Sequence, residues 1–199
     1  MRALLTIAFC FLLGCVAAAR TQELRDAASP NGRYPVRAVE SGFPSRISYD
    51  IVSVPRGALL HRFPSSYQPD EGSGDWSWEH TTDAEISWSA DSRYVAIDEQ
   101  VHRYIGEVLL AEVGAVTRSI RTPAKTLIAR TKLDWDRYRI RIRDGWLSQS
   151  DLSLGLAGKV VTSILDDGRR TYKHIQFHFV LRLNRGKATI TRLDEPEDA

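Results

Sequence analysis

An apolar side chain stands at every second position from Ile175 to Leu183, and this stripe restricts the fold more than any other feature of the sequence. It consists of Ile175, Phe177, Phe179, Leu181 and Leu183. Successive side chains of a β-strand point to opposite faces of a sheet, so this spacing predicts a strand with one buried face. Residues 137–143 repeat the pattern, with Tyr138, Ile140 and Ile142 on one face and four arginines on the other.

Further alternating segments and turn signals extend this prediction to most of the chain. Asp166-Asp167-Gly168 and Asn184-Arg185-Gly186 are typical of tight turns between antiparallel strands, and Asp144-Gly145 indicates a turn or bulge. One helix is expected near residues 122–131, with Thr122 as its cap and Pro123 in its first turn. The sequence therefore predicts an all-β fold of antiparallel meanders with one short helix.

Two stretches 60 positions apart share a turn that leads into an alternating strand. They are Ser29–Tyr34 (SPNGRY) and Ser89–Tyr94 (SADSRY). The surrounding stretch, residues 86–97, resembles the blade repeat of β-propellers of the WD and Tol-system type, although Ala90 and Ser92 replace the usual proline and glycine. The resemblance implies blade-like meanders over about half of the chain that follows the leader. The sequence leaves open whether these form an incomplete propeller or a sandwich.

The first 19 residues have the three parts of a secretory signal peptide. Arg2 is followed by the apolar run Ala3–Gly14 and by the small-residue site Ala17–Ala19. Leu12–Cys15 also resembles a lipobox, in which Cys15 would be lipidated, but simple secretion is favoured. We therefore expect an exported protein that is periplasmic, secreted or part of the cell envelope, and that is held at a membrane only through a lipidated Cys15.

The length of the chain suggests one domain, and its charge distribution suggests an acidic first half packed against a basic second half. We predict a signal peptide at 1–19, a linker at 20–28, a β-rich domain at 29–193 and an acidic tail at 194–199. The hydrophobic fraction of 43% and charged fraction of 26% are typical of a globular protein. Residues 21–100 carry 7 basic and 13 acidic side chains, whereas residues 101–199 carry 18 and 12. This asymmetry favours pairing between packed halves over a field that attracts an anionic partner.

The segment from Pro64 to Asp83 lacks strand or helix periodicity and is a candidate ligand-binding loop. Indole rings stack on sugar rings, and neighbouring carboxylates accept hydrogen bonds from the sugar hydroxyl groups. The competing and favoured interpretation places the tryptophans in the core. The candidate ligand-binding residues are Tyr67, Asp75, Trp76, Trp78, Glu79 and His80.

Four arginines form a candidate anion-binding row about 7 Å apart along one strand. They are Arg137, Arg139, Arg141 and Arg143. The favoured alternative is that they pair with acidic residues of the first half. Export argues against nucleic acid as the partner. On a strand, His174 and His178 lie about 13 Å apart, too far to share a metal ion.

No nucleophile elbow, phosphate-binding loop or dinucleotide motif occurs in the sequence, so no catalytic residue, metal or cofactor is predicted. The predicted function is that of an exported, non-enzymatic β-rich binding or envelope-accessory protein, with a saccharide or an envelope protein as partner. The alternative is an envelope glycan hydrolase that uses loop carboxylates such as Asp75 and Glu79.

Overall fold

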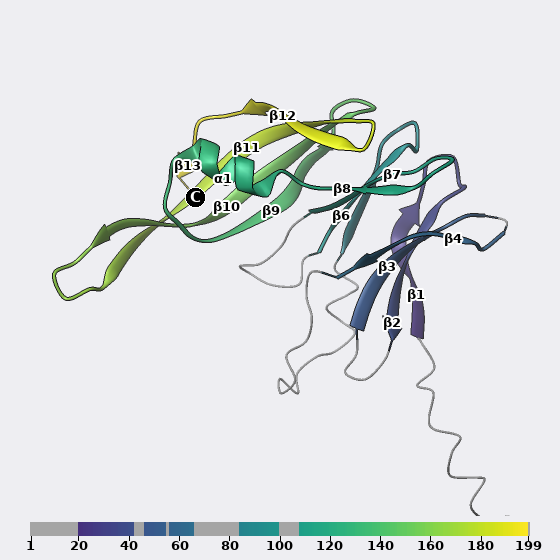
Figure 1. The fold of residues 1–199 in the computed structure, drawn as a ribbon, viewed down its shortest axis with the longest axis horizontal. Helices are drawn as coiled ribbons and strands as arrows, with labels where there is room; N and C mark the ends of the chain where they lie inside the picture. The colour runs from purple at the N-terminus through teal and green to yellow at the C-terminus, as the bar shows by residue number, and fades with distance from the viewer. Residues whose placement is uncertain (1–19, 42–45, 55, 66–83, 100–107, 199) are drawn as a thin grey trace, which may run out of the picture.

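The computed structural model describes residues 20–41, 46–54, 56–65, 84–99 and 108–198. These residues form three antiparallel sheets and one short helix, and the sheets do not close into a ring (Figure 1). The predicted all-β class, with antiparallel meanders and one short helix, is confirmed.

Each sheet is an up-and-down meander whose strands follow one another in chain order. Sheet 1 contains β1 (Arg20–Ala28), β2 (Pro35–Ser41), β3 (Arg46–Val52) and β4 (Leu59–Pro64). Sheet 2 contains β5 (Glu85–Trp88), β6 (Tyr94–Asp98), β7 (Val108–Glu112) and β8 (Arg118–Ile120). After helix α1 (Ala124–Thr131), sheet 3 contains β9 (Trp135–Trp146), β10 (Asp151–Ile164), β11 (Arg170–Asn184) and β12 (Lys187–Leu193), and β13 (Glu197–Asp198) also pairs with β11.

Sheet 2 lies between the other two, so it is buried on both faces. Val95 and Ile97 of β6 belong to the core shared with sheet 1. Tyr94 and Ala96 of the same strand belong to the core shared with sheet 3. All five residues of β6 are buried, which explains their nearly continuous apolar character. The first strands of the sheets are also neighbours, because β5 contacts both β1 and β9.

The two similar turns found in the sequence have the same hydrogen bonds. In the second turn, Ser89 Oγ donates to Asp91 Oδ1 (2.7 Å) and accepts from Tyr94 N (2.9 Å). The first turn makes the same two bonds 60 positions earlier, at 2.8 and 3.0 Å. Gly32 and Ser92 occupy equivalent positions with φ angles of 68° and 60°. Serine can therefore replace the glycine of the repeat here, at the cost of a left-handed backbone conformation.

The same turns help to join sheet 1 to sheet 2. Asn31 N donates to Ser92 Oγ (3.1 Å), which links one turn to the other. The rings of Tyr34 and Trp88 stack with centroids 6.4 Å apart, and Trp88 Nε1 donates to the carbonyl oxygen of Ala27 (3.0 Å). The shared turn motif thus has a packing role between neighbouring sheets.

Three local predictions were wrong. The expected linker at 20–28 is strand β1, whose ladder with β2 runs from Arg20↔Glu40 to Ala28↔Pro35. Backbone hydrogen bonding between strands does not require an apolar stripe, so a polar segment such as this one can still form a strand. The segment 194–199, predicted as a tail outside the β-rich domain, includes β13, which pairs with β11 of sheet 3. Helix α1 lacks a side-chain cap, because Thr122 Oγ1 donates instead to Val108 O (2.8 Å).

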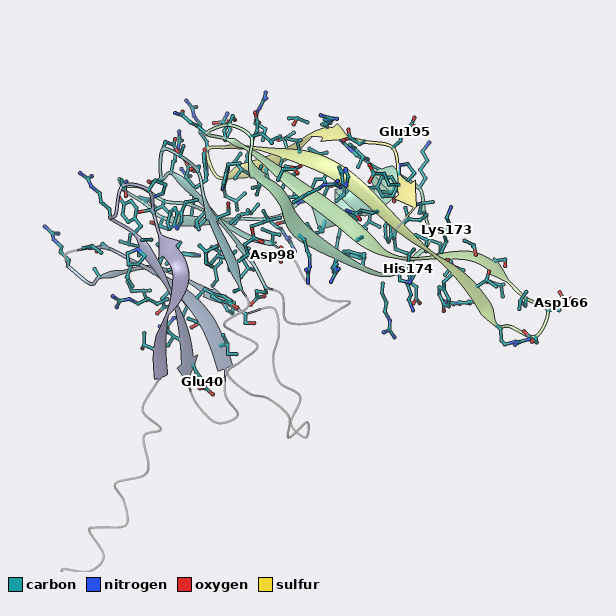
Figure 2. All side chains as sticks on the ribbon, turned by 180° about the vertical axis from the view of Figure 1, so that it is seen from behind. Glu40, Asp98, Asp166, Lys173, His174 and Glu195 are labelled. Carbon is teal, nitrogen blue, oxygen red and sulfur yellow. The ribbon has the colours of Figure 1, made fainter. Side chains whose placement is uncertain are left out.

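The hairpin of β10 and β11 projects beyond the rest of sheet 3. Pairing of β10 with β9 ends at Val160↔Trp135, while β10 and β11 continue to pair as far as Ile164↔Arg170. Figure 2 shows Asp166 at the tip of this arm, far from sheets 1 and 2. Gly168, with a φ of 80°, completes the predicted turn. The arm exposes 65% of Ile164.

Candidate functional site

Sheet 3 has one face in a hydrophobic core and one face outside it. Alternate residues such as Ile140, Leu154 and Phe179 are buried against sheet 2 and α1. The intervening residues point the other way, and none of them belongs to either hydrophobic core of the described residues. We call this surface the basic face and define it by its cations, Arg137, Arg139, Arg141 and Arg143 of β9, Lys159 of β10 and Arg192 of β12.

The arginines at the two ends of the β9 row are the most accessible. The side chain of Arg137 is 61% exposed and that of Arg143 is 37% exposed. Within the described residues, Arg137 Nε lies 3.8 Å from Asp136 Oδ2, and Arg143 Nε lies 3.9 Å from Asp144 Oδ1. Ion pairs at such distances in solvent are weak, so the pair with Asp144 leaves Arg143 able to contact an external anion.

The middle of the row lies beside a buried carboxylate of sheet 2. Asp98 is 2% exposed, and its Oδ2 accepts a hydrogen bond from the backbone N–H of Ile142 (2.9 Å). Burial raises the pKa of Asp98 to about 6, against the opposing effects of that N–H and of Arg141 and Arg139. Figure 2 places Asp98 where sheets 2 and 3 meet. Arg141 and Arg139 therefore lie close enough to this carboxyl group of the first half to lower its pKa.

A bulge near the end of β9 displays two charged residues side by side. The register with β10 shifts between Ile142↔Leu154 and Gly145↔Ser153, so Arg143 and Asp144 have no paired partner of their own. Gly145 has a φ of 72°, a conformation that favours glycine. Ser153 Oγ donates to Asp144 Oδ2 (2.7 Å) and holds that carboxylate in place. The predicted turn or bulge at Asp144-Gly145 is confirmed as a bulge.

A cavity of about 310 Å³ opens on the basic face beside this bulge. Its lining is mostly polar and comes from all four long strands of sheet 3. Arg192 donates through Nε to Asp194 Oδ1 (2.5 Å), so both members of this pair are held at the rim. His178 Nε2 lies 3.7 Å from Glu197 of β13. The lining residues are Arg143, Asp144, Leu147, Ser153, His178, Phe179, Val180, Arg192 and Asp194.

Two further polar pairs lie between sheets 1 and 2. His61 Nε2 and Ser119 Oγ are 2.6 Å apart, and burial lowers the pKa of His61. Tyr49 is fully buried, and its pKa is raised by burial and by the neighbouring carboxylate of Glu99. Both pairs connect β3 or β4 with sheet 2, which gives them a role in holding the sheets together.

The structure brings together only part of what the sequence singled out. Cys15 and the loop candidates Tyr67, Asp75, Trp76, Trp78, Glu79 and His80 lie outside the described residues. Within the described ranges, no three metal-ligating side chains gather at one point. In that same part of the chain, no helix has the length and apolar character needed to cross a membrane.

The cavity was missed by sequence reasoning. Its polar residues are spread from Arg143 to Asp194 along the chain, and only the strand register brings them together. The one available signal was Asp144-Gly145, because bulges often redirect side chains at functional sites.

Comparison with protein-family models, curated proteins and solved structures finds no significant match to this chain. The function of this chain is therefore inferred from its own geometry.

Proposed function

We propose that this chain is an exported, non-enzymatic binding protein of the cell envelope, and that its basic face contacts an anionic envelope component. The observation that carries the proposal is the cavity of about 310 Å³, which opens among the cations of a sheet face that takes no part in either hydrophobic core of the described residues. Ligand sites are usually concave and largely pre-formed, and a few placed polar groups give them specificity.

We also propose that the three sheets are blade-like units of an open, propeller-type array. Four observations support this: the sequential four-stranded meanders, the matched turns at Ser29–Tyr34 and Ser89–Tyr94, the face-to-face order of the sheets and the contacts between their first strands. In this arrangement sheet 2 packs against both sheet 1 and sheet 3, and this packing holds sheet 3 in place.

Binding is favoured over catalysis because, among the described residues, the carboxyl group whose pKa is raised toward neutrality is already buried and hydrogen-bonded inside the protein. A general acid or base must reach the substrate proton within hydrogen-bond distance. Asp98, whose pKa is about 6, is buried and accepts its hydrogen bond from Ile142. The alternative of a glycan hydrolase depends on Asp75 and Glu79, which lie outside the described residues.

Retention on a charged matrix tests the proposed anion binding. We expect the purified protein to bind dextran sulfate beads but not neutral dextran beads, and to elute as salt rises. The double variant Arg137→Gln/Lys159→Gln removes two cations of the basic face and should elute at lower salt. The matched control, Arg169→Gln/Arg170→Gln, removes two cations from the arm. Equal loss of retention in both double variants would show ion exchange by net charge and would reject the proposal.

Intact mass tests the export part of the proposal. Protein recovered from the envelope fraction of an expressing bacterium should begin near Arg20 and carry no lipid. An acylated N-terminal Cys15 would instead assign membrane attachment, and an uncleaved leader in cytosolic protein would reject export.

A further inference from the structure

We infer that the ligand of the basic face is a linear acidic polysaccharide, one sugar unit of which occupies the cavity at the β9 bulge. The inference rests on the proposed function and names the ligand class for the same face. It depends on three features: the mixed charge of the cavity lining, the fixed positions of its polar groups, and the arginine row that continues from it.

The cavity is lined by both positively and negatively charged side chains, so it favours anions that also carry hydrogen-bond donors. Arg143 and Arg192 supply guanidinium groups that form bidentate hydrogen bonds with a carboxylate, sulfate or phosphate. Asp144 and Asp194 line the same cavity and would repel a simple inorganic anion. A sugar acid satisfies both pairs, because its charged group meets the guanidinium groups and its hydroxyl groups donate to the carboxylates.

Several of these groups are held in place before any ligand arrives. Asp144 is fixed by Ser153 Oγ at 2.7 Å, and Arg192 is fixed by Asp194 at 2.5 Å. The Gly145 bulge leaves Arg143 and Asp144 unpaired next to each other, and both line the cavity. A pre-positioned set of donors and acceptors loses less conformational entropy on binding. The volume of about 310 Å³ is at the small end of ligand pockets and suits one sugar unit.

The arginine row extends the contact beyond a single sugar. Arg141, Arg139 and Arg137 follow Arg143 along β9 at intervals of about 7 Å. Regularly spaced cations along one strand match a chain with a repeating charge. Small neutral residues, Gly155 and Ala157, are the β10 partners of Arg141 and Arg139, so the β10 side of the row carries no bulky side chain there.

A membrane surface fits the same face less well. Binding to lipid headgroups is strengthened by apolar side chains that enter the acyl boundary. Leu147 is the large exposed apolar residue at the cavity, whereas Ile164, Leu165 and Tyr172 lie on the projecting arm. We therefore favour a soluble or wall-bound polysaccharide over a lipid bilayer.

Titration with defined probes tests the ligand class. The probes are galacturonic acid, oligogalacturonates of increasing length, neutral malto-oligosaccharides, inorganic phosphate and phosphatidylglycerol vesicles. We expect affinity to rise with oligogalacturonate length and to be absent for malto-oligosaccharides. Arg143→Gln should weaken oligogalacturonate binding about tenfold, because it removes one charge-assisted bidentate contact. Arg169→Gln, on the arm, should leave that binding unchanged.

Asp144→Asn separates sugar recognition from simple charge attraction. The asparagine still accepts the hydrogen bond from Ser153 but has lost its negative charge. If a sugar hydroxyl donates to Asp144, the variant should bind oligogalacturonate more weakly and phosphate more tightly. Tighter binding of both probes would overturn the inference while leaving anion binding by the basic face intact. Preferential binding to vesicles would also overturn it, and failure of every anionic probe would reject the proposed function itself.

Discussion

The phenol ring of Tyr94 in sheet 2 stacks on the indole ring of Trp146 in sheet 3, with centroids 6.0 Å apart and an angle of 20° between the ring planes. Tyr34 and Trp88 make the same contact between sheets 1 and 2, at 6.4 Å and 24°. Tyr94 is the first residue of β6 and Tyr34 immediately precedes β2, the second strand of each sheet, while each tryptophan ends the first strand of the next sheet. The repeated joint supports a chain built from equivalent units.

The two joints differ in one hydrogen bond, which leads to the first prediction. Trp88 Nε1 donates to Ala27 O, whereas Trp146 Nε1 is buried and has no hydrogen-bond partner in the part of the chain that the structure describes. Both Trp→Phe variants keep a stacked ring and lose similar volume. We expect Trp88→Phe to be more destabilising than Trp146→Phe by about 1 kcal/mol, measured by urea unfolding followed by circular dichroism. Equal losses would show that the Ala27 hydrogen bond contributes no net stability.

The raised pKa of Asp98 gives a stability that falls as pH rises. Between its ordinary value of 3.8 and its folded value of about 6, the folded chain holds a proton on Asp98 that the unfolded chain has released. The free energy of unfolding therefore decreases across this window, by at most about 3 kcal/mol from this group. The Asp98→Asn variant cannot titrate here, so this pH dependence is lost, while the asparagine still accepts the hydrogen bond from the backbone N–H of Ile142. We expect the wild-type stability, measured relative to this variant, to fall between pH 4 and 6.

Asp151 provides a control of opposite sign. The hydrogen bond from Arg182 lowers the pKa of Asp151, despite partial burial. Its contribution to stability is present above its unfolded pKa and is lost as pH falls below that value. Relative to Asp151→Asn, the wild type should therefore gain stability as pH rises through the acidic range. If wild-type stability relative to the matching Asn variant changed with pH in the same direction for both aspartates, burial would not be the dominant influence on the pKa of Asp98.

The strands could be predicted from the sequence because alternation is a local property. The stripe from Ile175 to Leu183 is buried as expected, and Ile140 and Ile142 lie on the covered face of β9. Strand β1 was missed because its pairing depends on the backbone of β2, which composition does not record. The α1 cap was misassigned because Thr122 bonds to Val108, 14 positions away.

The candidate site was less predictable, because it depends on register between distant strands. The arginine row was visible as a local pattern, and its outward direction followed from the alternation. Predicting the cavity would also require the register of two strand pairs, because Ser153 faces the β9 bulge and Arg192 lies opposite Val180. A one-residue shift in either pairing would turn these side chains to the other face. Local spacing does not set that register.

The shared turn provides a third prediction. Ser89 is fully buried, and its Oγ both accepts from Tyr94 N (2.9 Å) and donates to Asp91 Oδ1 (2.7 Å). In Ser89→Ala the buried N–H of Tyr94 loses its partner, so we expect a loss of about 1–3 kcal/mol in the free energy of unfolding. The control Ser148→Ala removes a hydroxyl from an exposed turn and should cost less. Comparable losses would mean that the Ser89 turn does not support the joint between sheets.

The two glycines of β10 should respond differently to the same added methyl group. A Cβ at Gly158 would overlap the carbonyl oxygen of Arg137 and lie 2.7 Å from the Cα of Tyr138, so β9 would have to move away from β10. At Gly155 the nearest atom, Gln176 Nε2, would be 3.9 Å away, which is ordinary contact. Overpacking against backbone costs about 1–3 kcal/mol, so Gly158→Ala should lower the unfolding midpoint in urea.

Gly155→Ala should leave that midpoint nearly unchanged. Because Gly155 pairs with Arg141 of the basic face, the same variant adds a methyl group beside the arginine row. We expect it to weaken oligogalacturonate binding while the fold remains stable. A Gly155→Ala protein with unchanged binding would place the ligand away from the middle of the row. A stable Gly158→Ala protein would instead show that β9 and β10 are separated more widely at this point.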